Sequence, residues 1–112
     1  MGDFELPFKA IFTCGQDQAT GEYVAHALDF DLICTGATPE ESLEKLRQCT
    51  KAYIEFGYSQ GWKKYIDFPA PEECWERALT DEKPMTPLPP IIIDKTKFLV
   101  FAVRENEACA AA

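Results

Sequence analysis

The segment Thr38–Leu46, TPEESLEKL, marks the start of a helix in three independent ways. The Thr38 hydroxyl can accept a hydrogen bond from the backbone N–H of Glu41, and the Glu41 carboxylate can return one, which makes a capping box. Pro39 occupies the first helical position, where its missing N–H and preset φ cost nothing. Three glutamates in the first two turns face the positive end of the helix dipole. The pattern predicts a helix that begins at Thr38.

One side of this helix is expected to pack on a core. Apolar and small residues recur at helical spacing along it and form a single stripe. Glycines at positions 57 and 61 predict that the helix ends near one of them. The residues of the stripe are Leu43, Leu46, Cys49, Thr50, Ala52, Tyr53 and Phe56.

Three short strand patterns precede the helix. Residues 7–14 (PFKAIFTC) alternate between two sets of side chains, and residues 23–28 (YVAHAL) and 32–35 (LICT) have the composition of strands. The turn-rich segment GQDQATGE joins the first two, and the tight DFD segment joins the last two. Strands joined by such short connections pair as an antiparallel meander.

The sequence after the helix is less regular. Residues 71–79 open with a proline and two acids and predict a helix of about two turns. Residues 80–90 contain four prolines, so we expect an extended connection rather than a strand or helix there. Residues 91–93 and 98–103 read as strands around a short turn. Because 98–103 is apolar on both faces, we expect it to lie inside the sheet.

Together these elements predict a single α+β domain over residues 1–104. It consists of a three-stranded antiparallel meander, a long helix across one face, and a late strand or strand pair that extends the sheet. The tail, residues 105–112, has no apolar periodicity and is expected to fray.

Composition and charge restrict the partners. The chain has 112 residues, is 46% hydrophobic and carries a formal net charge of −8, as expected for one acidic globular domain. This acidity argues against general binding to nucleic acid or to anionic membranes. The charge is unevenly placed, since residues 1–31 and residues 67–82 each carry −5 and the rest is close to neutral. We therefore interpret these two segments as candidate faces for a basic protein.

The cysteines and the lack of targeting patterns in the sequence indicate the cellular compartment of the protein. No apolar run is long enough to span a bilayer, and the first ten residues contain two acids and no apolar segment, unlike a secretory signal. The chain has five cysteines, an odd number, and no two of them form a CxxC motif. These features predict a cytoplasmic protein with reduced, mostly buried thiols.

Five residues are candidates for binding a partner. Asp29 and Asp31 flank Phe30 in the tight connection, where they either contact a basic partner or only stabilise the turn. Large aromatic side chains follow the long helix, and they either form an exposed recognition patch or seal the open side of the sheet. These aromatic residues are Trp62, Phe68 and Trp75.

The sequence offers little support for catalysis. His26 is the only histidine, and a Cys–His pair with Cys14 or Cys34 on a neighbouring strand is one hypothesis. The alternative is that His26 packs as an ordinary residue of a half-buried sheet. No phosphate-binding loop, nucleophile motif or metal-ligand motif occurs. We therefore expect no enzyme activity, no catalytic residues, no cofactor and no metal.

Three consecutive stretches resemble the N-terminal domain of HicB-family antitoxins. They are Gly21–Ala25 (GEYVA), Asp29–Cys34 (DFDLIC) and Thr35–Leu43 (TGATPEESL), and the resemblance covers about residues 8–57. The family shows a Gly-rich turn into a Tyr-Val-Ala strand and a Gly-x-Thr-x-Glu-Glu helix start. This chain departs from the family pattern just before Cys34. The family has Leu-Pro-Gly there, whereas residues 30–33 of this chain contain neither proline nor glycine. The resemblance implies a truncated RNase H-like sheet with a helix on one face.

The resemblance also implies a function. Members of the family bind and neutralise a small basic RNA-cleaving toxin without catalysis, and many carry a separate operator-binding segment. After residue 66 this chain has no basic recognition helix, so we expect no direct binding to nucleic acid. The alternative is an orphan structural or regulatory domain that kept the fold without a toxin. Uncovered sheet edges in so small a domain predict a homo-oligomer in either case.

Overall fold

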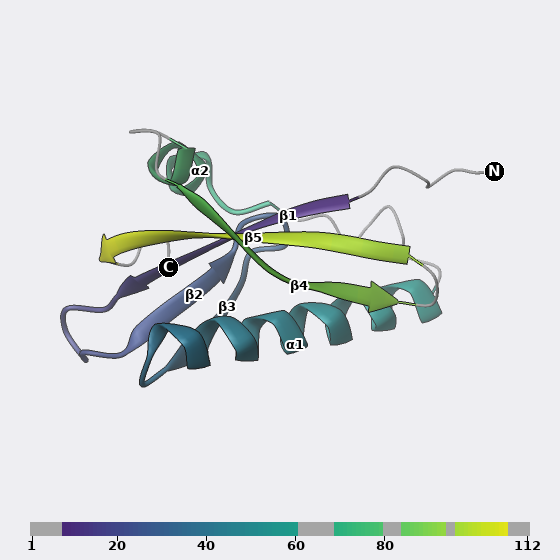
Figure 1. Ribbon diagram of the computed structural model, residues 1–112, viewed down its shortest axis with the longest axis horizontal. Helices are drawn as coiled ribbons and strands as arrows, with labels where there is room; N and C mark the ends of the chain where they lie inside the picture. The colour runs from purple at the N-terminus through teal and green to yellow at the C-terminus, as the bar shows by residue number, and fades with distance from the viewer. Residues whose placement is uncertain (1–7, 61–68, 80–83, 94–95, 108–112) are drawn as a thin grey trace.

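The computed structural model describes residues 8–60, 69–79, 84–93 and 96–107 (Figure 1). It confirms the α+β class, with a mixed five-stranded sheet between two helices. The elements in chain order are β1 (Phe8–Gln16), β2 (Tyr23–Ala27), β3 (Leu32–Gly36), α1 (Pro39–Ser59), α2 (Glu72–Leu79), β4 (Met85–Ile93) and β5 (Thr96–Glu107).

The strands lie in the order β3-β2-β1-β5-β4. The antiparallel meander β1–β2–β3 is present as expected, and β4 and β5 form an antiparallel pair that extends the sheet. The two halves join where β5 runs parallel to β1, with Phe12 opposite Ala102. Strand β5 has a neighbouring strand on each side, so it lies inside the sheet, as its apolar sequence predicts.

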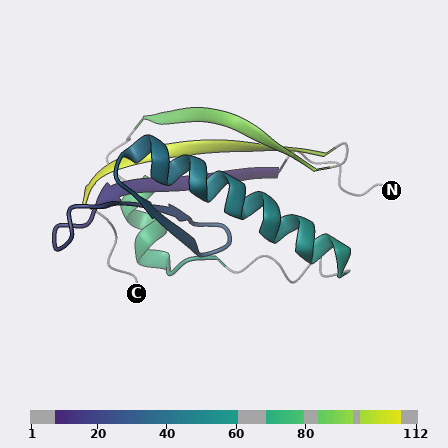
Figure 2. The ribbon, with the colours of Figure 1, turned by 90° about the horizontal axis from the view of Figure 1, so that it is seen from below.

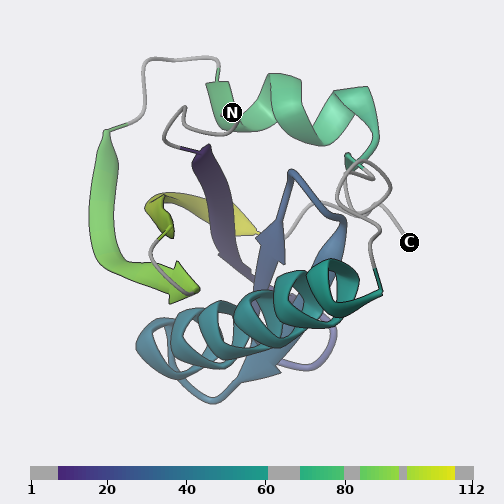
Figure 3. The ribbon, with the colours of Figure 1, turned by 90° about the vertical axis from the view of Figure 1, so that its right-hand side faces the viewer.

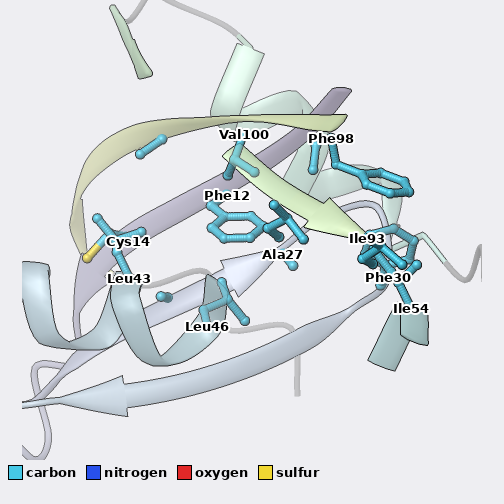
Figure 4. Close-up of a cluster of buried hydrophobic side chains, with 14 residues drawn as sticks. Phe12, Cys14, Ala27, Phe30, Leu43, Leu46, Ile54, Ile93, Phe98 and Val100 are labelled. Atoms are coloured by element: carbon cyan, nitrogen blue, oxygen red, sulfur yellow. The ribbon is translucent and has the colours of Figure 1, made fainter. Parts of the chain in front are cut away.

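Helix α1 covers one face of the sheet along its length (Figure 2). Thr38 is its N-cap and Gln60 its C-cap, so the predicted start is confirmed and the end falls between the two glycines proposed for it. Alternate residues of β1 and β2 point toward α1, because side chains of a strand alternate between faces. The core between them is drawn in Figure 4 and includes Phe12, Ala25, Ala27, Phe30, Leu43, Leu46, Ile54, Phe98, Val100 and Ala102.

The start of α1 uses a variant of the expected capping box. The backbone N–H of Glu41 donates to Oγ1 of Thr38 at 3.1 Å, as predicted. The return bond goes one residue further back, because Oε1 of Glu41 accepts from the N–H of Ala37 at 2.7 Å. This backbone hydrogen bond, assisted by the nearby Lys45 charge, lowers the pKa of Glu41 below its ordinary value of 4.5. The helix start is therefore held in part by an ionised carboxylate.

The variant Glu41→Gln tests this acid-sensitive cap. A lowered pKa in the folded state stabilises the protein above pH 4.5, and this contribution disappears as pH falls through the lowered value. A glutamine can still accept from Ala37 but does not titrate. We expect the wild type to be the more stable protein at pH 7 and the difference to shrink below pH 4.5. Urea unfolding from pH 7 to pH 3 measures it, and a difference independent of pH would contradict the expectation.

Helix α2 lies on the opposite face of the sheet from α1 (Figure 3). It is short, and its inward side consists of Cys74 and Ala78, which are spaced one turn apart and are both buried. These residues pack with Leu28 and Ala70 in a second, smaller core cluster. The predicted helix over residues 71–79 is therefore confirmed, with its start at Glu72.

The prediction of an extended connection over residues 80–90 is wrong for the second half of this segment. Residues from Met85 onward belong to β4, and Pro87 lies opposite Phe101 of β5. The prolines are tolerated because β4 is an edge strand, so only one of its sides pairs with a neighbour. The register shifts between Leu88 and Ile91, where two further prolines stand.

Two other expectations, a frayed C-terminal tail and reduced thiols, are each wrong in part. Strand β5 extends to Glu107, three residues into the segment expected to fray. Cys14, Cys34 and Cys49 are free thiols, but Cys74 is disulfide-bonded, so the expectation of reduced thiols is wrong at that position. None of the described helices is both long and apolar enough to cross a bilayer.

Candidate functional site

The two aspartates of the β2–β3 connection both make structural contacts. Oδ2 of Asp29 accepts a hydrogen bond from the backbone N–H of Ile11 at 2.8 Å, which ties the turn to β1. Oδ1 of Asp31 lies 2.6 Å from Nε2 of His26, whose side chain is buried. The side chain of Asp31 remains 46% exposed. Turn stabilisation therefore accounts for Asp29, whereas Asp31 both pairs with His26 and faces solvent.

The backbone of this connection is tight, which explains its aspartates. The N–H groups of Phe30 and Asp31 both donate to the carbonyl of Ala27, at 3.3 and 2.8 Å. Asp31 has a φ of 56°, in the left-handed region that asparagine and aspartate tolerate better than most residues. Between the two carboxylates, the Phe30 ring turns toward α1 and contacts the Tyr53 ring, with centroids 5.6 Å apart. The DFD segment thus places its aromatic ring in the core.

Of the three aromatic residues proposed for a recognition patch, one is described. Trp75 is half-buried and packs against the small cluster formed by Leu28, Ala70, Cys74 and Ala78. It therefore helps to seal the sheet face opposite α1, although part of its ring surface remains accessible. Trp62 and Phe68 lie outside the described residues.

The fold brings the two acidic segments of the sequence together. The N–H of Ala70, just before α2, donates to the carbonyl of Leu28 at 2.8 Å, and the Leu28 side chain is fully buried beneath α2. The β2–β3 connection and α2 therefore meet on the side of the sheet opposite α1 (Figure 3). Sequence reasoning located both segments but not their contact, because nothing in the composition pairs residue 28 with residue 70.

Helix α2 presents carboxylates on its outer side. Since Cys74 and Ala78 point inward, Glu72, Glu73 and Glu76 are left exposed. Within the part of the chain that the structure describes, none of these three has an ion-pair partner. We call the surface formed by Asp31, Glu72, Glu73 and Glu76 the acidic face. These four residues come from the two acidic segments that the charge distribution indicated.

The hypothetical Cys–His pair is contradicted by the sheet register. Cys14, Ala25 and Cys34 lie opposite one another on β1, β2 and β3 and point toward α1. His26 is the next residue of β2, so its ring lies on the other face, level with Thr13 and Ile33. The cysteine thiols have partners on the α1 side, Ser42 for Cys14 and Cys49 for Cys34. His26 is a packed residue that pairs with Asp31.

A second feature, a groove between α1 and β4, was not foreseen. A pocket in this groove, lined in part by Leu43, Leu88 and Pro89, has a volume of about 180 Å³. The guanidinium group of Arg47 spans it, donating to the Glu44 carboxylate and, at 3.3 Å, to the carbonyl of Pro90. Arg104 of β5 lies 3.2 Å from Glu40 at the same place. Arg47 and Arg104 are therefore paired within the protein. The contact of Arg47 with Pro90 holds β4 against α1.

Metal binding has no support among the described residues, where no group of three or more His, Cys, Asp or Glu side chains converges. No protein family, curated protein or solved structure matches the chain.

Proposed function

We propose that the protein is a non-catalytic, antitoxin-type binding protein whose acidic face binds a small basic protein. By the HicB resemblance, this partner is an RNA-cleaving toxin that the bound protein neutralises. One observation carries the proposal: the hydrogen bond between Ala70 and Leu28 places the β2–β3 connection, which carries Asp31, beside the segment that leads into α2. The proposal includes no cofactor, no DNA-binding segment and no direct contact with nucleic acid.

The charges of the acidic face favour this kind of partner. Exposed carboxylates attract basic proteins and raise the rate of association, and salt weakens the attraction. The half-buried ring of Trp75 supplies apolar surface among them, and aromatic side chains are common at the centres of interfaces. Helix α1 is a poorer candidate, because Glu40, Glu41 and Glu44 are already paired with Arg104, Lys45 and Arg47.

Affinity capture from the native lysate tests the proposal. Three baits are compared: the wild type, the variant E72Q/E73Q/E76Q, and the control E22Q/E40Q/E55Q. Both variants lose three exposed carboxylates, but the control loses them from α1 and from the β1–β2 connection. We expect the wild type and the control to retain a small basic protein at low salt and less of it at moderate salt. The α2 variant should retain little at either. Recovery of no small basic protein by the wild type would overturn the proposal.

A second proposal concerns self-association, and strand β3 favours it. It is an edge strand of five residues, LICTG, without charge or proline, and Ile33 is 52% exposed on it. The opposite edge, β4, carries three prolines that hinder pairing. We propose that two copies pair through β3, which also fits an orphan structural or regulatory domain that has no toxin.

The variant Ile33→Lys tests this pairing. A lysine on an edge strand disfavours contact with a second strand, so we expect a shift from dimer to monomer. Ile92→Lys is the matched control, since Ile92 is 53% exposed on the other edge strand, and it should leave the dimer intact. Analytical ultracentrifugation measures both. A monomeric wild type, or equal effects of the two variants, would contradict pairing through β3.

A further inference from the structure

We propose that Cys34 and Cys49 are a modification site: a thiol pair that a small-molecule disulfide oxidises to an intramolecular disulfide bond. The two sulfur atoms lie 3.4 Å apart, in hydrogen-bond contact. A disulfide bond is about 2 Å long, so its formation requires the sulfurs to approach by little more than 1 Å. Both cysteines are free thiols in the structure.

The fold, rather than the sequence spacing, brings the pair together. Cys34 lies in the middle of β3 and points toward α1, level with Ala25 of β2. Cys49 lies in the third turn of α1, beside the part of the helix that packs on the core. The two cysteines are 15 positions apart along the chain, and the residues between them include the capped start of α1. The disulfide would therefore close a loop that contains the N-terminal cap of α1.

The two thiols have different roles in the reaction. Burial, together with the contact to Cys49, raises the pKa of Cys34 to about 11. Cys34 therefore keeps its proton at neutral pH and donates its S–H to the sulfur of Cys49. Cys49 is solvent-exposed, so an external reagent reaches it first. The geometry thus assigns Cys49 as the attacking thiol and Cys34 as the resolving thiol.

The reaction balances with a low-molecular-weight disulfide such as glutathione disulfide as the oxidant. The Cys49 thiolate attacks one sulfur of the reagent, forming a mixed disulfide and releasing one thiolate, which takes up the proton lost by Cys49. The sulfur of Cys34 then attacks Cys49, expels the second thiolate and passes its proton to it. The protein dithiol loses two electrons and two protons, and the reagent is reduced to two thiols.

Cys14, the third free cysteine among the described residues, provides an internal contrast. Cys14 is buried, its Sγ lies 3.4 Å from Oγ of Ser42, and burial raises its pKa. A buried thiol of this kind is inert toward reagents in solution. The site is therefore selective for the pair between β3 and α1. The inference does not depend on the proposed function, because it concerns the layer opposite the acidic face.

Mass spectrometry after treatment of the full chain with glutathione disulfide tests the inference. We expect a product lighter by two hydrogen atoms, in which a non-reducing digest links the peptides of Cys34 and Cys49, and which dithiothreitol reverses. The variant C34S lacks the resolving thiol and should instead accumulate glutathione on Cys49. A wild type that keeps both thiols reduced, or accumulates as much mixed disulfide as C34S, would overturn the inference.

Thermal unfolding provides a second readout. A disulfide that closes a loop of this length restricts the unfolded chain, so we expect the oxidised protein to melt higher than the reduced protein by roughly 10 °C. C49S, treated in the same way, should show no shift. An oxidised wild type that melts no higher than the reduced form would mean that the disulfide does not fit the native β3–α1 geometry.

Discussion

Replacement of Phe12 by alanine is expected to lower the free energy of unfolding by about 3–5 kcal/mol. Phe12 is fully buried at the centre of β1, the middle strand of the sheet. Its neighbours in register on β2 and β5 are Ala27 and Ala102, so its ring is the one large side chain of these three paired positions in the core (Figure 4). Two alanines beside the cavity cannot close it.

Equilibrium unfolding in urea measures this loss, which is a large part of the 5–15 kcal/mol typical of a whole domain. Phe12→Leu is the control, because it keeps most of the apolar volume and should cost less than half as much. Equal losses for the two variants, or a loss below about 1 kcal/mol for alanine, would contradict the placement of Phe12 at the centre of the core.

Replacement of Gly36 by alanine is expected to destabilise the protein by about 1–3 kcal/mol, although it adds a single methyl group. Gly36 is the last residue of β3 and is buried against the first turn of α1. A Cβ atom there would lie 2.8 Å from the backbone nitrogen of Ser42 and 3.1 Å from the side chain of Glu41. Because the nearest atom belongs to the backbone, the helix start itself must move.

Urea unfolding of Gly36→Ala, with Thr35→Ala as the control, checks this close approach. Thr35 precedes Gly36 on the same strand but is exposed, so its replacement should change the stability by no more than about 0.5 kcal/mol. Gly36→Ala should also weaken the cap, which amide exchange at Ala37 and Glu41 reports. A stable Gly36→Ala variant with an unchanged cap would contradict the contact between β3 and α1.

Most of the architecture follows from local sequence signals. The cap at Thr38, the alternation in β1 and the two-sided apolar pattern of β5 each reflect short-range rules of helix and strand formation. The error at Met85–Pro90 arose because prolines exclude a central strand but not an edge strand. Whether a strand lies at an edge depends on the pairing of β5 with β1, which no local pattern encodes.

The sequence predicts only part of the candidate site, because contacts between distant segments have no local pattern. The sequence predicts that Asp29 and Asp31 either stabilise the turn or contact a partner, and both carboxylates make internal contacts, to Ile11 and to His26. The contact of Leu28 with Ala70, which joins the acidic segments, spans 42 positions and has no local signature. The contact between Cys34 and Cys49 likewise requires the packing of β3 on α1.

The most direct test of the proposed function is the affinity of the captured basic protein as a function of salt. Titration calorimetry would compare the wild type with E72Q/E73Q/E76Q and with the control E22Q/E40Q/E55Q. We predict that the α2 variant binds about tenfold more weakly at low salt, as expected for the loss of three interfacial charges, and depends less on salt. The control should stay within about twofold of the wild type. Equal weakening of both variants would mean that net charge alone governs binding, and would contradict a defined acidic face.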